Sequence, residues 1–323
     1  MIGGSGRRVA ASVTLAALLA LGAPAAAQNY SPGYKFLEAV EKKDIAEVEK
    51  LLGKPGSTLI NSRDITNGRT ALHIATQRRD IVWLVFLANK GANPNIADMA
   101  GTAALYAAVD MNSLQWVQGR PAPILSDRLD GVDLVGRLLQ KGADPNARLK
   151  RAPLKRHHDA GSTMNFGEGA TPLMRAARTN DVAVMKLLLD GGANPFLTLP
   201  DGTNALHIAA GQGFGGLRGE GIRIVTPTPE GAVDAVRLLL DRGMDVDAFN
   251  NAGQTALHAS VNRGDAVVKL LVSRGARLLK NKAGFTPLDL ALGQGGRGGR
   301  GGQVRETTAA ILREYMAAAA KRN

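Results

Sequence analysis

The stretch from Asn251 to Ala276 reads NAGQTALHASVNRGDAVVKLLVSRGA and constrains the fold more than any other part of the chain. A glycine turn and Thr255, whose side-chain oxygen can cap a helix N-terminus, precede a short apolar run that predicts a first helix. After a second turn, valines and leucines are spaced as on one face of a second helix, and Gly275 follows as a left-handed C-cap. Two helices this short cannot bury their apolar faces alone, so the unit predicts neighbours of its own kind.

The same pattern recurs along the chain. Its copies read TALHIAT from Thr70, AALYAAV from Ala103, TPLMRAA from Thr171, NALHIAA from Asn204, TALHASV from Thr255 and TPLDLAL from Thr286. Two intervals between aligned leucines, Leu72 to Leu105 and Leu173 to Leu206, are about 33 residues. This period and the T-P-L-H-x-A-A pattern resemble the ankyrin-repeat family. The resemblance implies an all-α ankyrin-repeat solenoid of about seven helix-turn-helix units with hairpin-like finger turns.

The two outermost units are predicted to act as caps, because each has one face without a partner. Residues 36–52 carry the core spacing of the repeat with a charged outer face, and 307–316 supply a closing helix with Ile311 and Leu312 inward. We therefore expect an N-terminal linker at 28–34, the ankyrin-repeat domain at 35–316 and a disordered C-terminal tail at 317–323.

Residues 1–27 have the features of a secretory signal peptide. Arg7 and Arg8 precede an apolar run from Val9 to Leu21, and three alanines end at Ala27. The run is about 13 residues long, short of the roughly 20 needed to span a bilayer. We expect cleavage after Ala27 and a periplasmic or secreted protein, with an uncleaved anchor as the alternative.

Units three, five and seven each contain a long insertion between their first and second helices. These three loops are expected on one edge of the array, while a fourth insertion, 148–168, interrupts the turn between units three and four on the opposite edge, where the fingers project. Insertions in repeat arrays often lie on the binding face.

The insertions supply two sets of candidate partner-binding residues. The fourth insertion has a basic cluster that could meet carboxylates or phosphates, formed by Arg148, Lys150, Arg151, Lys155 and Arg156. The loops of units three and five offer aromatic and arginine side chains suited to a protein interface, namely Trp116, Arg120, Phe214, Arg218 and Arg223. The alternatives are a solvated mobile loop for the first set and residues that fold back over the stack for the second.

The sequence offers little for catalysis or cofactor binding. His73, His207 and His258 recur once per unit and so do not converge, and the family resemblance implies that they hydrogen-bond loop backbone. The absence of cysteine excludes disulfides and Cys-ligated zinc. No Ser-His-Asp set, paired carboxylates or phosphate loop is present, so we expect no enzyme and no cofactor. Two Arg-Gly-Gly copies at 297–302 are better interpreted as a flexible linker than as a nucleic-acid site.

These observations predict an exported, monomeric ankyrin-repeat scaffold for protein–protein interaction, with no nucleic-acid partner. The formal net charge of +12 favours a protein partner with an acidic surface. One alternative is peripheral contact with an anionic envelope lipid or polymer. A weaker alternative is a metal-dependent enzyme that uses His157, His158 and Asp159.

Overall fold

The computed structural model describes residues 30–55, 57–112, 130–153, 166–212, 229–295 and 302–321. The helical array forms one compact unit, Pro32–Asn323. Its described helices are α1 (Pro32–Lys42), α2 (Ile45–Leu52), the short 3-10 helix η1 (Leu59–Asn61), α3 (Ala71–Gln77), α4 (Ile81–Asn89), α5 (Ala104–Asn112), α6 (Gly131–Gln140), α7 (Pro172–Thr179), α8 (Val182–Asp190), α9 (Ala205–Ala209), α10 (Pro229–Asp241), α11 (Ala256–Ser260), α12 (Asp265–Ser273), α13 (Pro287–Ala291) and α14 (Glu306–Ala320).

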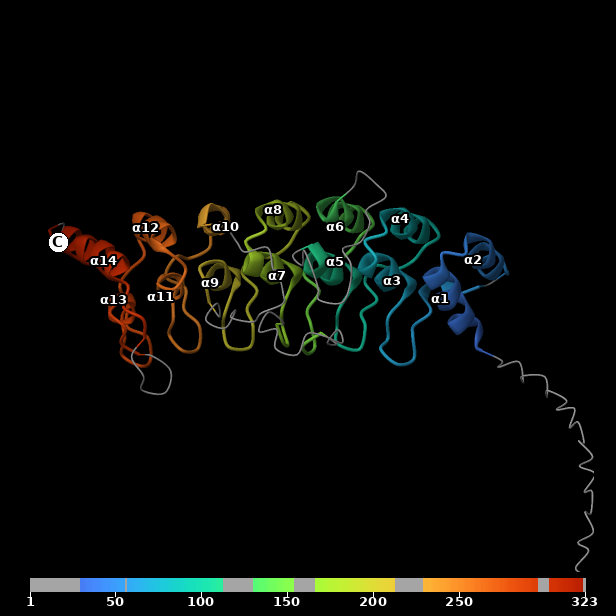
Figure 1. Ribbon diagram of the computed structural model, residues 1–323, viewed down its shortest axis with the longest axis horizontal. Coiled ribbons are helices and arrows are strands. Elements are labelled where there is room, and N and C mark those ends of the chain that lie inside the picture. The colour runs from blue at the N-terminus through green and yellow to red at the C-terminus, as the bar shows by residue number, and fades with distance from the viewer. Residues whose placement is uncertain are drawn as a thin grey trace, which may run out of the picture. The chain divides into compact units, whose positions relative to one another are not determined.

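The α-helices form seven antiparallel pairs in two rows (Figure 1). Odd-numbered helices, the first helices of each unit, contact one another from α1 through α13, and even-numbered helices form the second row. Loops project from the side of the first-helix row. The predicted all-α ankyrin array of seven units is therefore confirmed.

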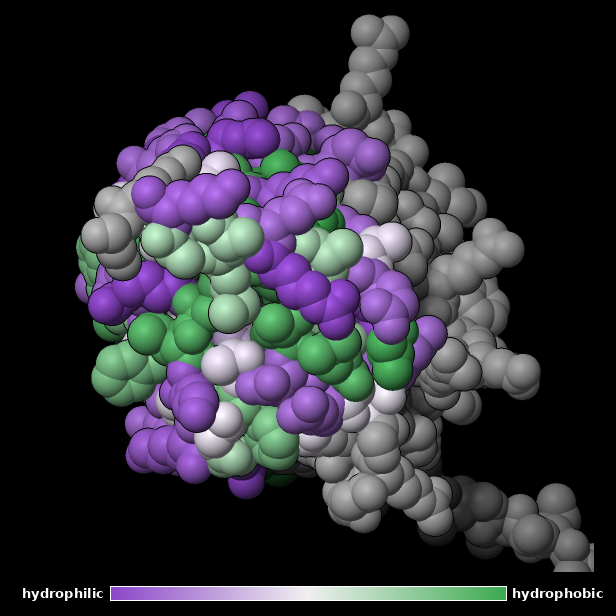
Figure 2. Space-filling view, turned by 90° about the vertical axis from the view of Figure 1, so that its left-hand side faces the viewer, coloured by the Kyte–Doolittle hydropathy of each residue, from purple (hydrophilic) through white to green (hydrophobic). Residues whose placement is uncertain are grey.

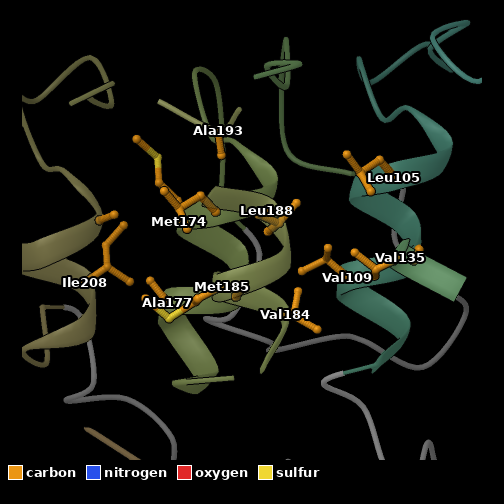
Figure 3. Close-up of a cluster of buried hydrophobic side chains, with 14 of the residues drawn as sticks. Leu105, Val109, Val135, Met174, Ala177, Val184, Met185, Leu188, Ala193 and Ile208 are labelled. Carbon is orange, nitrogen blue, oxygen red and sulfur yellow. The ribbon is translucent and has the colours of Figure 1, made fainter. Parts of the chain in front are cut away.

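Buried leucine, valine, methionine and alanine side chains fill the space between the rows (Figure 3). Leu105 from α5, Leu173 from α7 and Leu188 from α8 are each at most 1% exposed. Ala176 and Ala177, both 0% exposed, let neighbouring helices approach closely. The core is continuous from one unit to the next, as expected when each short pair depends on its neighbours for burial.

A left-handed glycine ends the second helix of a unit, as the sequence predicts. Gly275 follows α12 with a φ of +88°, and the backbone N–H of Ala276 donates to Leu271 O at 3.0 Å. This bond satisfies a carbonyl that the helix end would otherwise leave unpaired.

The two end units of the array have the buried inner face and the exposed outer face that the sequence predicts for caps. Phe36 and Leu312 are buried, while Glu41 and Glu314 face solvent. Figure 2 looks onto the end that carries α13 and α14, where hydrophobic and hydrophilic surface are interspersed. There Leu288 is partly exposed, because no further unit covers it.

The first and last helices of the array extend beyond the predicted domain limits of 35–316. α1 begins at Pro32, inside the predicted linker, because proline suits the first turn of a helix. α14 continues to Ala320 and shortens the predicted tail at 317–323, because alanine has the highest helix propensity. The predicted leader at 1–27 lies outside the described residues.

Most residues of the predicted insertions lie outside the described ones. In the order of the chain, the undescribed stretches fall between α5 and α6, between α6 and α7, between α9 and α10, and between α13 and α14.

Candidate functional site

The fingers are the turns between the second helix of one unit and the first helix of the next, and an Asp or Asn side chain shapes most of them. In one finger, Asn250 Oδ1 accepts from the backbone N–H groups of Ala252 and Gln254, both at 3.0 Å. Asp98 and Asn281 make the corresponding pair of bonds in their fingers. The side-chain oxygen accepts hydrogen bonds that backbone carbonyl groups would otherwise accept, and these bonds fix the shape of the tight turn.

Neighbouring fingers are joined near their tips by backbone hydrogen bonds. Lys150 N donates to Ala100 O at 2.9 Å, and Asn251 N donates to Asp201 O at 2.7 Å. Pro200 stands at the equivalent position between these two and has no N–H to donate. The fingers therefore form a largely fixed surface, which loses little conformational entropy when a partner binds.

The recurring histidines connect each first helix to the next finger. The backbone N–H of Thr255 donates to His258 Nδ1 at 3.1 Å, so Nε2 carries the proton and donates to Phe285 O at 3.1 Å. His73 and His207 make the same pair of bonds, to Thr102 O at 2.7 Å and Gln254 O at 3.0 Å. The expected structural role is confirmed. Burial lowers the pKa of all three imidazoles below their ordinary value.

The predicted basic cluster is only partly described. Arg148, Lys150 and Arg151 are exposed, and they form no ion pair within the described segments. Arg148 Nη2 donates to Thr198 O at 3.0 Å, so its guanidinium lies against the next finger. The two other members, Lys155 and Arg156, lie outside the described residues, as do His157, His158 and Asp159.

Two exposed aromatic residues on adjacent fingers were not predicted. Phe196 is 59% exposed and Phe249 is 70% exposed. Phe196 occupies the position of Asn95 and Asn146, whose side chains donate to Gly142 O at 2.9 Å and Gly192 O at 3.0 Å in the next unit. Aligning the runs NPN, DPN and NPF would have shown that phenylalanine replaces this structural asparagine.

We define the finger surface as Arg148, Lys150, Arg151, Phe196 and Phe249. It combines apolar side chains with cations on backbone turns that are hydrogen-bonded to their neighbours. Aromatic and arginine side chains contribute strongly to protein interfaces, and arginine pairs well with carboxylates. The finger surface therefore combines two kinds of side chain that are common in protein interfaces.

The second predicted set lies outside the described residues, namely Trp116, Arg120, Phe214, Arg218 and Arg223. Within the described segments, no group of three or more His, Asp or Glu side chains could hold a metal ion. In the same segments, every helix is too short or too polar to cross a membrane.

Comparison with known proteins agrees with this geometry. A family model described as "Ankyrin repeats (3 copies)" matches residues 36–119, 129–218 and 228–298. The crystal structure of EF0377, an ankyrin repeat protein, superposes with a TM-score of 0.53 at 23% identity, covering 77% of this chain and 100% of that one. This structural likeness supports the fold alone.

Three curated relatives share parts of the sequence. Palmitoyltransferase AKR1 of Lachancea kluyveri is 32% identical over 39% of this chain and 16% of its own length. The human transient receptor potential cation channel subfamily A member 1 is 25% identical over 80% of this chain and 32% of its own. The mouse B-cell lymphoma 3 protein homolog is 29% identical over 74% of this chain and 50% of its own. The chain thus spans half or less of the length of each relative. With the family pattern matched over most of its length, the chain belongs to the ankyrin-repeat family.

Proposed function

We propose that this chain is an exported, monomeric scaffold that binds a protein partner with an acidic surface through its finger surface. Ankyrin-repeat arrays are protein-interaction scaffolds and are typically non-catalytic. The observation that carries the finer proposal is the pair of exposed phenylalanines on neighbouring fingers, because the finger with Phe196 also contacts exposed Arg148.

The finger surface presents two kinds of contact in a fixed arrangement. Phe196 and Phe249 lie on neighbouring fingers that are joined through Asn251 N and Asp201 O. Arg148 lies against the finger that carries Phe196, because it donates to Thr198 O. A partner that places an apolar side chain between carboxylates would match both kinds of contact.

Site-specific crosslinking in cells tests the location of this surface. A photoreactive phenylalanine analogue at position 249 should capture a specific partner, and the same analogue at exposed Lys269 on α12 should not. Capture at both positions, or at Lys269 alone, would place the interface elsewhere.

Charge and aromatic variants test the chemistry on the captured partner. Replacing Arg148, Lys150 and Arg151 with Ser should weaken binding and reduce its salt dependence, and Phe249→Ala should weaken it at least about tenfold. The matched control replaces three other exposed cations with Ser, namely Arg237 on α10, Arg242 directly after α10 and Lys269 on α12. Equal effects of the two triple variants would refute a specific basic site.

Envelope association remains the second candidate, because the predicted mature chain would keep a strongly basic composition. Envelope association predicts salt-sensitive co-sedimentation with envelopes, and Phe249→Ala should leave this co-sedimentation unchanged.

Export rests on the leader at 1–27, and mass spectrometry should find a mature N-terminus at Gln28. A full-length chain in the cytoplasm would contradict export.

A further inference from the structure

The most exposed large apolar side chain of the described residues lies at the tip of the first finger, between α2 and α3. Ile65 is 92% exposed and directly follows Asp64, whose Oδ1 atom accepts from the backbone N–H groups of Thr66 at 2.7 Å and Asn67 at 3.2 Å. These bonds hold the turn in shape while the Ile65 side chain projects into solvent. Single exposed apolar residues are common on protein surfaces, so a site here requires a second one beside it.

Met99 supplies that second apolar residue on the neighbouring finger, between α4 and α5. It is 45% exposed and directly follows Asp98, which shapes its own turn. The two fingers are joined by a hydrogen bond from Met99 N to Asn67 O at 2.9 Å. A Cβ atom added at Gly68 would lie 3.3 Å from Met99 Cγ, so the Met99 side chain lies against the first finger. Ile65 and Met99 therefore place apolar surface on two adjacent, hydrogen-bonded tips.

The fingers further along the chain have polar residues or proline at the equivalent position. These residues are all exposed, namely Lys150, Pro200, Asn251 and Lys282. Because lysine and asparagine occupy the same position in other units, burial within the array does not require an apolar side chain there. The apolar tips of the first two fingers are thus available to an external partner.

Exposed cations flank the two apolar tips. The guanidinium of Arg63 bridges the first two fingers by donating to Gly68 O at 3.2 Å and to Ala97 O at 2.7 Å. Lys150 occupies the tip of the third finger, which is hydrogen-bonded to the second finger through Ala100 O. Neither cation forms an ion pair with another residue that the structure describes. Both charges are therefore open to an external anion.

The acidic residues of the first two fingers are engaged in the turns themselves. Asp64 and Asp98 are the only acids in the stretches 53–70 and 90–103. Each accepts hydrogen bonds from two backbone N–H groups of its own turn, and Asp98 is 6% exposed. On the third finger, exposed Glu168 lies on the side of the fourth finger, because its neighbour Gly169 would place an added Cβ 3.2 Å from Pro200. The outward charge beside the apolar tips is therefore positive.

We propose that the tips of the first two fingers contact an anionic lipid bilayer. Ile65 and Met99 enter its interfacial region, and the two flanking cations, Arg63 and Lys150, pair with lipid phosphates. The fingers project in a row from one side of the array (Figure 1), so neighbouring tips meet a flat surface together. The two apolar side chains protrude on separate tips, whereas a protein interface has a continuous buried apolar core. The proposal rests on envelope association, the second candidate function above, and gives it a surface.

A fluorescent probe at the tip tests where the bilayer is contacted. The chain has no cysteine, so Ile65→Cys can be labelled at one position with an environment-sensitive dye. Chain that starts at Gln28 keeps the whole compact unit Pro32–Asn323 and excludes any contribution from the apolar leader. The dye emission should shift to the blue with phosphatidylglycerol vesicles and not with phosphatidylcholine vesicles. The same dye on Lys269→Cys, exposed on α12, should not respond. A response at 269 alone, or equal responses at both positions, would overturn the proposal.

Co-sedimentation of unlabelled chain with phosphatidylglycerol vesicles tests the chemistry. Replacing both Ile65 and Met99 with Ser should weaken binding at least about tenfold, because two apolar side chains no longer leave water. The matched control is Val82→Ser, which removes a side chain that is 62% exposed on α4 in the second row of helices and should leave binding unchanged.

Three outcomes of this experiment would overturn the proposal, and they have different meanings. Wild-type chain that does not bind the vesicles would exclude a bilayer and leave the protein partner of the finger surface untouched. A double variant that binds as tightly as wild type would show that envelope association uses another surface. A double variant that binds vesicles normally but loses the protein captured at position 249 would assign the two tips to the protein interface.

Discussion

Acidification should weaken the array through His73, His207 and His258. Each is at most 2% exposed and uses Nδ1 as an acceptor, so the folded array holds the neutral imidazole. Burial lowers the folded-state pKa of each below the ordinary value of 6.5 that applies in the unfolded chain. The unfolded chain therefore binds more protons as the pH falls below about 6.5. The free energy of unfolding is thus retained at neutral pH and lost progressively in acid.

The size of this effect follows from proton linkage. An imidazole that stays neutral in the folded state loses at most about 1.2 kcal/mol between about pH 7 and pH 5.5. Three such groups lose at most about 4 kcal/mol together. Because domains are generally stable by about 5–15 kcal/mol, the loss should be easy to detect.

Urea unfolding followed by circular dichroism at a series of pH values measures the effect. Replacing the three histidines with Gln should lower stability at neutral pH and flatten the pH dependence of the urea midpoint. His157 and His158 supply a matched control, since their replacement with Gln should leave the slope unchanged. The reasoning is refuted if the triple variant retains the wild-type slope, or if the control flattens it equally.

Two matched pairs of substitutions test how the array is held together, each by comparing free energies of unfolding in urea. Leu173→Ala removes a side chain that is 1% exposed in a central unit and should cost about 3 kcal/mol, whereas Leu288→Ala in the partly uncovered last unit should cost clearly less. Equal losses of unfolding free energy in the two variants would contradict the idea that the last unit is less well covered. Gly253→Ala should destabilise more than Gly275→Ala, because both have positive φ but an added Cβ at 253 would lie 2.9 Å from Lys282 N in the next finger. At position 275 the added Cβ would contact nothing within 4 Å. A larger loss of stability at 275 than at 253 would show that backbone strain, and not contact with the next finger, determines the cost.

The sequence predicts the features that repeat. The T-x-L-H run specifies a helix start, a buried leucine and a histidine bound to the next finger, and each recurs in the structure. Such features depend on contacts within a unit or between adjacent units of the same pattern. The structure expected for one unit therefore also applies to the other units with the same sequence pattern.

The sequence does not predict features that depart from the repeat. Arg175 and Asp110 belong to different units with a long insertion between them, so no local spacing indicates their ion pair. Phe196 and Phe249 occupy different positions in their fingers, and only the folded array shows that both are exposed on adjacent fingers. The basic cluster was recognisable because its cations are close in sequence, whereas its nearness to the next finger depends on one long-range bond from Arg148.

The ion pair between Arg175 and Asp110 should be energetically independent of the finger surface. Arg175 is 1% exposed and belongs to α7, and its Nε donates to Asp110 Oδ1 in α5, whereas Phe249 lies in the finger between α10 and α11. Effects of substitutions at separate sites that share no partner usually add within about 0.5 kcal/mol. A double-mutant cycle between Phe249→Ala and Arg175→Leu, measured on partner binding, should therefore show almost no coupling. Strong coupling would mean that the ion pair helps to order the finger that carries Phe249.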